Sequence, residues 1–442
     1  MGQKKKAILI TLDALAGAEY EAIQKLPNFS RMLRSGACCP YERSVYPSLT
    51  FPCHASIATG CNPGTHGIVS NYLPEPGLER PHWNFYAKNL RRPALWDYAS
   101  DAGRKVLSMS WPVSSGGKIR WSMPEMTPAK PKIWDADSFI RQLGVFYRYG
   151  TPGFCWKTLL SHKGLAESWF LGRQPQLDEH MIGAFLRAVS EKPFDIALLH
   201  IYGMDDAKHT FGTRSPQAAK YLKLYDRFAG RLMAYVDQER KKGVHTTLLI
   251  TGDHSQKDTH SAIYGNYLLS LLGLSRLQDG LVAEYRAYLD SCDGMAYIYL
   301  NKELQGDRQE TLDLVRACFR DHPGVKAVLE PSELRALGGD PDADLALEAK
   351  EGYYFKSGRW PDGTPPDRNG IAPADHKAVH GYLPEDPDYY TMMLAYGPDV
   401  RPGIVERMGL IDILPTLCQW MDIPFGPVEG TVIPGLLQDP EQ

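Results

Sequence analysis

DIALLHI at residues 195–201, a helical stretch at 215–243 and TTLLIT at 246–251 form the part of the chain that decides the fold. Each apolar run is continuous, which is typical of a strand buried on both faces. Ser215-Pro216 predicts the helix start, Lys241-Lys242-Gly243 predicts its end, and the apolar residues between them keep helical spacing. A strand, a helix and a second strand form a parallel crossover, so we expect a doubly wound, mostly parallel α/β sheet.

Further strands are expected on either side of this unit. AILITL at 7–12 and YTMMLA at 390–395 have the same continuous apolar character. After Asp258 the pattern changes to a compact alternation of short strands and helices. We therefore expect a small inserted α/β subdomain at 259–374, which would divide the main domain into 1–258 and 375–442.

Composition narrows the class of protein. The 442 residues are 43% hydrophobic and 23% charged, as in an ordinary globular protein with a large core. The net charge of −3 gives no reason to expect a nucleic acid polymer or a membrane as partner, and no feature here predicts an oligomeric state. Eight cysteines without a C-x-x-C pair favour a reducing compartment, and the first apolar run is too short for a signal peptide. We expect a cytoplasmic protein.

Acidic and imidazole side chains follow the predicted strands. Parallel strands end at a common edge, where open α/β sheets place their ligands. The residues in question are Asp13, Asp205, His209, Asp253, His254 and His380. Singly, such residues are most often helix caps, surface charge pairs or loop residues. Together, carboxylates and neutral imidazoles are the ligands of zinc or manganese, and six of them suit two divalent ions better than one.

Thr50 is the candidate nucleophile beside this group. It precedes a predicted helix, because Pro52 suits a first helical turn and Gly60 can end the helix. A hydroxyl there lies near free backbone N–H groups and the positive end of the helix dipole, which favour a phosphate oxygen or an alkoxide. Most threonines at this position only cap the helix, so both interpretations stay open.

The ordered set of motifs resembles the nucleotide pyrophosphatase/phosphodiesterase family of the alkaline phosphatase superfamily. The resemblance runs from Ala7 to about Pro424 and implies an alkaline phosphatase-like fold. The motifs that carry it are Leu12-Asp13, Thr50-Phe51-Pro52-x-His54, Asp205-x-x-x-His209, Asp253-His254 and His380-Gly381-Tyr382.

The resemblance implies two zinc sites, although the ligand types also accept manganese. Asp205, His209 and His380 would hold one ion, and Asp13, Thr50, Asp253 and His254 the other. Thr50 would attack phosphorus to give a phospho-threonine intermediate, and the Phe51 amide would bind a phosphate oxygen. The substrate would be a small phosphate ester, with nucleotides among the candidates. Asn71 falls near the cleft in the family pattern and is a candidate substrate contact.

Two positions depart from the family pattern. Cys53 replaces an asparagine expected to donate to a phosphate oxygen, and a thiol is a poor donor. Either that contact is lost, or Cys53 is a small buried residue that fills space. Ser255 replaces a glycine after the Asp-His pair. Phosphonate, phosphomonoester or sulfate ester hydrolysis on the same site is one alternative function, and a non-catalytic binding protein that retains the fold is another.

Other aromatic residues near these motifs have less specific expectations. Phe51, Tyr72, Trp83, Tyr86 and Trp111 would either wall a site for a flat leaving group or pack in the core. His54 and His66 are not at ligand positions of the family pattern, so we expect them to pack or to hydrogen-bond around the site.

Overall fold

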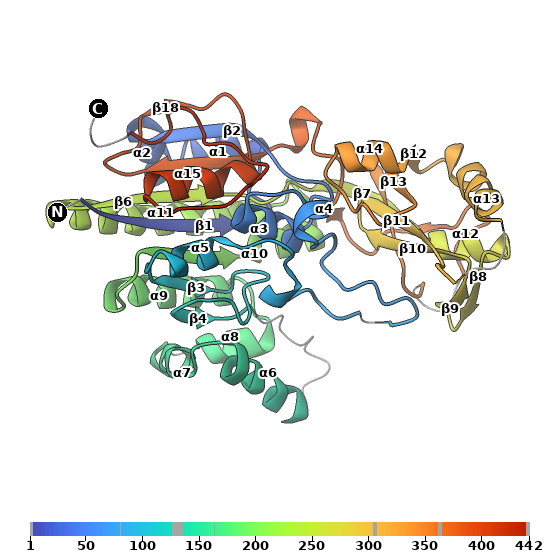
Figure 1. The fold of residues 1–442 in the computed structure, drawn as a ribbon, viewed down its shortest axis with the longest axis horizontal. Helices are drawn as coiled ribbons and strands as arrows, with labels where there is room; N and C mark the ends of the chain where they lie inside the picture. Colours follow the sequence, from blue (N-terminus) through green and yellow to red (C-terminus); the bar gives the residue numbers. More distant parts are fainter. Residues whose placement is uncertain are drawn as a thin grey trace.

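The computed structural model describes residues 3–79, 81–125, 136–162, 164–303, 307–360 and 365–438. In this part of the chain the largest sheet has nine strands (Figure 1). Its order is β18 (Gly403–Ile404), β2 (Ala37–Arg43), β17 (Thr391–Tyr396), β6 (Val244–Thr251), β1 (Lys4–Leu12), β5 (Ile196–Ile201), β3 (Val106–Met109) and β4 (Trp121–Met123), with β19 (Met408–Gly409) paired to β2.

The centre of this sheet is parallel, which confirms the predicted fold class. β1 pairs in parallel with β5 on one side and β6 on the other, with Thr11 opposite both His200 and Thr251. β17 lies antiparallel to its neighbours β6 and β2. The carboxyl ends of β1, β5 and β6 therefore meet at one edge of the sheet.

Helices cover both faces because alternate side chains of a strand point to opposite sides. Ile8 and Ile10 of β1 face a core shared with α2 (Pro27–Ser35), α9 (Gln176–Glu191) and α11 (Pro216–Lys241). Ala7 and Leu9 face a second core shared with α3 (Thr50–Thr59), α5 (Leu95–Asp101) and α15 (Ile413–Trp420). α11 follows the predicted helix closely. Smaller helices are α1 (Tyr20–Ile23), α4 (Pro63–His66) and α10 (Gly203–Phe211).

Between β4 and β5 the described chain is helical. It forms α6 (Ala136–Tyr149), α7 (Pro152–Ser161) and α8 (Leu165–Leu171), which precede α9. These helices lie at the lower edge of the sheet in Figure 1. The Phe146 and Trp169 rings pack edge to face and belong to the first core.

A second group of elements lies to the right of the large sheet in Figure 1, coloured yellow to orange. An antiparallel sheet runs in the order β10 (Ala287–Cys292), β11 (Met295–Leu300), β13 (Leu345–Ala349) and β12 (Val325–Leu329). Around it are α12 (Gly265–Leu271), α13 (Arg308–Arg320), α14 (Pro331–Ala336) and the hairpin β8 (Ser275–Gln278) to β9 (Leu281–Tyr285). The four-stranded sheet, α12 and α13 share a separate hydrophobic core.

A further small sheet joins this group to the main body. β7 (Lys257–Ile263) pairs with β14 (Gly352–Phe355), β15 (Ile371–Pro373) and β16 (Ala378–Val379). The partners Asp258 and Ala378 hold the entry and exit of the intervening chain side by side. We propose 259–374 as a subdomain on this basis. In the part of the chain that the structure describes, no helix combines the length and apolar character needed to cross a bilayer.

Candidate active site

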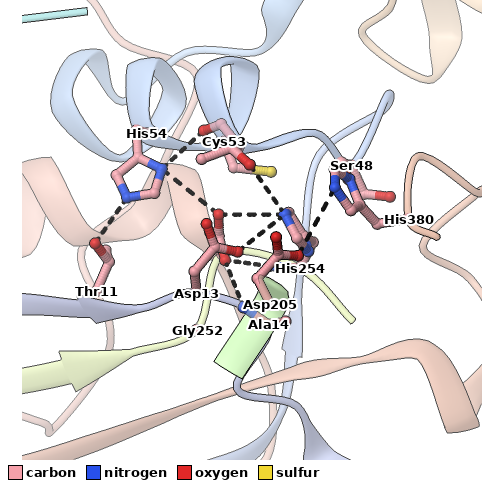
Figure 2. A network of polar contacts seen from close by, with 12 residues as sticks. Thr11, Asp13, Ala14, Ser48, Cys53, His54, Asp205, Gly252, His254 and His380 are labelled. Atoms are coloured by element: carbon pink, nitrogen blue, oxygen red, sulfur yellow. Dashed lines mark hydrogen bonds and ion pairs between the residues drawn. The ribbon is translucent and has the colours of Figure 1, made fainter. Parts of the chain in front are cut away.

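The six predicted acidic and imidazole residues come together at the carboxyl edge of the large sheet. They form two groups, and within each group one possible ligand atom per residue lies within 4.8 Å of the others. The first group is Asp13, Asp253 and His254, and the second is Asp205, His209 and His380. Figure 2 shows the side chains of Asp13, Asp205, His254 and His380 converging below the helix that carries His54.

The first group is fully buried and is built from the ends of two adjacent parallel strands. Asp13 follows β1, and Asp253 and His254 follow β6. His254 Nε2 lies 3.2 Å from Asp13 Oδ1 and 3.4 Å from Asp253 Oδ2. Asp253 Oδ1 accepts hydrogen bonds from two backbone amides, that of Ala14 at 3.2 Å and that of His254 at 3.0 Å. In the part of the chain that the structure describes, two carboxylate oxygens of this group make no hydrogen bond. They are Asp253 Oδ2 and Asp13 Oδ1.

The second group combines α10 with the segment after β16. Asp205 and His209 are one helical turn apart on α10, and Asp205 Oδ2 lies 3.4 Å from His209 Nε2. His380 Nε2 lies 3.9 Å from Asp205 Oδ1. His209 Nδ1 donates to the Ala378 carbonyl at 2.7 Å, and His380 Nδ1 donates to the Ser48 carbonyl at 3.2 Å. Both rings therefore direct Nε2 toward the site, and in the neutral ring this nitrogen can bind a metal.

The two groups are adjacent. The rings of His254 and His380 stack with centroids 3.8 Å apart and planes 13° from parallel. A site that holds two cations close together is the arrangement that clamps the attacking and leaving oxygens of a phosphoryl group.

The electrostatics of the site favour bound cations. Burial, reinforced by Asp205, raises the pKa of Asp13 well above its usual value, and burial together with Asp13 does the same to the pKa of Asp253. Burial and the neighbouring imidazoles lower the pKa of His254, and burial lowers the pKa of His380. Clustered carboxylates are costly to bury without compensating charge, and divalent ions would supply it. The unpartnered buried oxygens of Asp13 and Asp253 also fit metal ligands.

Thr50 stands beside the first group. α3 begins at Thr50 itself, and Leu49 occupies the flanking position, so the helix starts one residue earlier than predicted. Gly60 ends the helix in a left-handed conformation with φ of 66°, as expected. Thr50 is half-buried, and its Oγ1 lies 3.3 Å from His254 Nε2. Its hydroxyl thus makes no capping bond within the helix and faces the predicted ligands.

The Phe51 amide differs from its expected role. It donates to Asn71 Oδ1 at 2.9 Å and is therefore already bonded. This bond fixes the Asn71 side chain next to Thr50, with its amide nitrogen left as a donor. The loop that carries Asn71 is separated from α3 along the chain, which is why sequence spacing did not reveal the contact.

Cys53 is fully buried within α3. Its Sγ lies 3.2 Å from Ser44 Oγ, which in turn donates to the Asp253 carbonyl at 2.6 Å. Burial raises the pKa of the Cys53 thiol well above its usual value. The thiol therefore serves packing, which favours the space-filling interpretation of this departure from the family pattern.

Neither His54 nor His66 belongs to the ligand groups. His54 Nδ1 donates to the Thr50 carbonyl at 2.7 Å. His54 Nε2 accepts a hydrogen bond from Thr11 Oγ1 at 2.7 Å. His66 bonds to Ser56 Oγ at 2.9 Å.

The predicted aromatic wall is only partly assembled. The Phe51 and Trp83 rings lie 5.2 Å apart, and Tyr72 lies 4.4 Å from Trp83. Trp111 is buried against His54, and Tyr86 contacts a tyrosine elsewhere.

Two further residues next to the ligands were not predicted. Gln256 donates through Nε2 to the Asp205 carboxylate and lies one residue beyond Ser255. His200, on β5, shares a hydrogen bond between its Nε2 and Asp13 Oδ2 at 3.0 Å. The one available signal was the histidine within the otherwise apolar run of residues 195–201.

Comparison with known proteins identifies the family. The model of the type I phosphodiesterase / nucleotide pyrophosphatase family matches residues 7–383. The chain belongs to this family. The match includes all six predicted ligands and Thr50.

Curated relatives are venom phosphodiesterases. The enzyme of Naja atra is 26% identical over 259 residues, which cover 57% of this chain and 26% of the relative. Venom phosphodiesterase 2 of Crotalus adamanteus is 24% identical over 265 residues, which cover 58% of this chain and 27% of the relative. The matched part therefore spans about a quarter of the length of these relatives.

Solved structures show the same fold. Murine ectonucleotide pyrophosphatase/phosphodiesterase 5, as an inactive threonine-to-alanine variant in complex with AMP, has a TM-score of 0.65 and 18% identity, with 97% of this chain and 98% of the other covered. The human protein has a TM-score of 0.65 and 19% identity, with 98% and 100% covered.

These relatives contradict the expected cytoplasmic location. They are venom enzymes and ectonucleotide enzymes, which points to the outside of the cell. The cysteine argument was wrong for a physical reason. All eight cysteines are free thiols and all but Cys318 are buried, so they reflect core packing and not the redox state of a compartment.

Proposed function

We propose that this protein is a two-metal hydrolase that cleaves phosphodiester or pyrophosphate bonds with Thr50 as nucleophile. The observation that carries the proposal is the convergence of two metal-type ligand groups on one threonine hydroxyl. Asp205, His209 and His380 would hold one cation. Asp13, Asp253 and His254, with Thr50 Oγ1, would hold the other. Zinc is our first choice of metal, and manganese suits the same ligands.

The metals would lower the pKa of the Thr50 hydroxyl and offset the charge of the phosphoryl group. Thr50 would supply the attacking oxygen, and Asn71 would help to hold the phosphate. Deprotonated Thr50 Oγ1 forms a bond to phosphorus while the bond from phosphorus to the leaving group breaks, which gives phospho-threonine. The oxygen of a water molecule then bonds to phosphorus while the bond from phosphorus to Oγ1 breaks, and a proton from that water returns to Oγ1. The Asn71 amide would donate to a phosphate oxygen, with its position fixed by the Phe51 amide.

A nucleotide is the substrate class that we favour. One structural neighbour is described in complex with AMP, and the family name refers to nucleotide pyrophosphate bonds. In this chain Phe51, Tyr72 and Trp83 form an aromatic cluster whose first member directly follows Thr50. A flat base could stack on such a cluster.

Substitution of Thr50 tests the proposal. Thr50→Ala should abolish turnover of bis(p-nitrophenyl) phosphate by zinc-loaded protein, while Thr50→Ser should keep part of it because a hydroxyl remains. Thr59→Ala, at the other end of the same helix, is the control and should remain active. Unchanged turnover in Thr50→Ala would refute the nucleophile.

The same preparation should be assayed with monoester, phosphonate and sulfate ester substrates. A clear preference for one of these over the diester would replace the proposed bond specificity. If the protein binds less than one equivalent of metal and added zinc does not restore binding, the catalytic proposal fails in favour of a binding protein.

A further inference from the structure

His200 lies next to the first ligand group, with its ring 4.4 Å from that of His54. It is 2% exposed and projects from β5 next to the end of β1. Its Nε2 lies 3.0 Å from Asp13 Oδ2. Its Nδ1 faces the Ser110 carbonyl at 3.2 Å and Glu125 Oε1 at 3.7 Å. The ring therefore bonds to the Ser110 carbonyl through Nδ1, with the Glu125 carboxylate nearby, and to Asp13 through Nε2.

The two carboxylates of the first group share one arrangement. In Asp253, Oδ1 is engaged by the amides of Ala14 and His254, and Oδ2 has no partner. In Asp13, Oδ2 is engaged by His200 and Oδ1 has no partner. Each carboxylate thus has one oxygen held by a hydrogen bond, while its other oxygen makes no hydrogen bond to the described residues and lies near His254 Nε2. Asp253 is held by the backbone, whereas Asp13 is held by a side chain.

We infer that His200 is a positioning residue that fixes Asp13 so that only Oδ1 is available to a cation. The inference rests on the proposed function, because it concerns the ion that Asp13 would share with Asp253 and His254. A ligand whose orientation is fixed in advance loses less freedom on binding. Hydrogen-bond partners of ligating groups typically change metal affinity by about 10- to 100-fold.

Glutamine is the conservative replacement for His200, because its side-chain amide keeps a hydrogen-bonding nitrogen. Its Nε2 can take the place of the imidazole Nε2 and donate to Asp13, whereas leucine fills similar space without a donor. We expect His200→Leu to weaken the binding of one zinc ion by about 10- to 100-fold and to leave the other ion unchanged. His200→Gln should bind both ions within about threefold of the unsubstituted protein. Equilibrium dialysis against buffered zinc measures both affinities without reference to activity.

Two controls separate this effect from general damage. His322 is another buried histidine, bonded to the Asn369 carbonyl far from the site, so His322→Leu reports the cost of losing a buried imidazole. It should bind both ions normally. Asp13→Ala should lose the same ion that His200→Leu weakens. If Asp13→Ala keeps both ions, the proposed metal site is wrong, and the inference falls with it.

A measurement on metal-free protein tests the hydrogen bond directly. In a long-range ¹H–¹⁵N spectrum, the Nε2 signal of His200 should move in Asp13→Ala, because this nitrogen shares a hydrogen bond with Asp13 Oδ2. The inference is overturned if the Nε2 signal is the same in Asp13→Ala as in the unsubstituted protein. It is equally overturned if folded His200→Leu binds both ions as tightly as the unsubstituted protein, or if His200→Gln is as defective as His200→Leu.

Discussion

Asn71 and Cys53 differ in how they lie relative to Thr50. The Asn71 amide is held beside Thr50 by the Phe51 backbone, whereas the Cys53 thiol faces Ser44 in the interior. A phosphate bound at Thr50 would therefore meet the Asn71 amide and not the thiol. We therefore expect that the absence of a donor at position 53 does not weaken the site, because the Asn71 amide from a different segment would supply one.

Substitution at these two positions should have opposite effects. Asn71→Asp keeps an oxygen for the Phe51 amide but removes the donor, and we expect kcat to fall by about 10²- to 10³-fold. Cys53→Ala should change kcat by less than about threefold and lower the free energy of unfolding by about 1 kcal/mol, as is usual for small losses in a core. Steady-state kinetics and urea unfolding measure the two effects. A large fall in kcat for Cys53→Ala, with Asn71→Asp unaffected, would reverse this assignment.

At the scale of elements, α3 and α4 are joined by a buried hydrogen bond between Ser56 and His66. Burial lowers the pKa of His66 from 6.5 to about 3. The folded protein therefore keeps this imidazole neutral, while the unfolded chain takes up a proton below pH 6.5. Stability from this group is complete above pH 6.5 and is lost as the pH falls towards 3.

A glutamine at position 66 would remove this dependence while keeping a donor for Ser56. Between pH 7.5 and pH 5, the unsubstituted protein should lose about 2 kcal/mol more of its free energy of unfolding than His66→Gln, from 1.4 kcal/mol per pH unit below 6.5. Urea unfolding at the two pH values, in one metal state, gives this difference. Equal losses in both proteins would show that His66 is not the group responsible.

Some elements could be predicted from the sequence because burial determines their composition. β1, β5 and β6 lie at the centre of the sheet, so both faces require apolar residues and the runs are continuous. β7 was not predicted, because its sequence KDTHSAI is largely polar and lies in a small peripheral sheet. α9 was also not predicted.

Single contacts across the fold were harder to predict. The six ligand residues follow strands or helices whose ends meet, so their convergence follows from topology. The pairs Phe51–Asn71 and His200–Asp13 depend on loop conformation and on strand register. Neither leaves a regular spacing in the sequence.

At the scale of the whole molecule, the proposed subdomain supports the site through His380. The His380 carbonyl accepts the Gly294 amide at 2.8 Å, in the turn between β10 and β11. Gly381 follows with φ of 90°, and a Cβ there would lie 2.0 Å from the Cys292 carbonyl oxygen. The turn and the segment carrying His380 are thus packed against each other without space for a side chain.

Gly381→Ala should separate the turn between β10 and β11 from the segment that carries His380. The left-handed backbone and the steric overlap would displace His380, so we expect the ion at Asp205, His209 and His380 to bind at least tenfold more weakly while the other ion is retained. Equilibrium dialysis against zinc measures both. Gly358→Ala, where an added Cβ meets nothing within 4 Å, is the matched control. Normal binding of both ions by Gly381→Ala would show that the subdomain does not support His380.

The position of His380 also has a consequence for biosynthesis. The ligand groups begin at Asp13 and end at His380, and the last of them docks on a turn that is itself made late. While the chain is still being translated, one of the two ion sites lacks its final imidazole. Loading of both proposed ion sites therefore requires synthesis through residue 380, and a product truncated before this residue would lack one ligand of the second group.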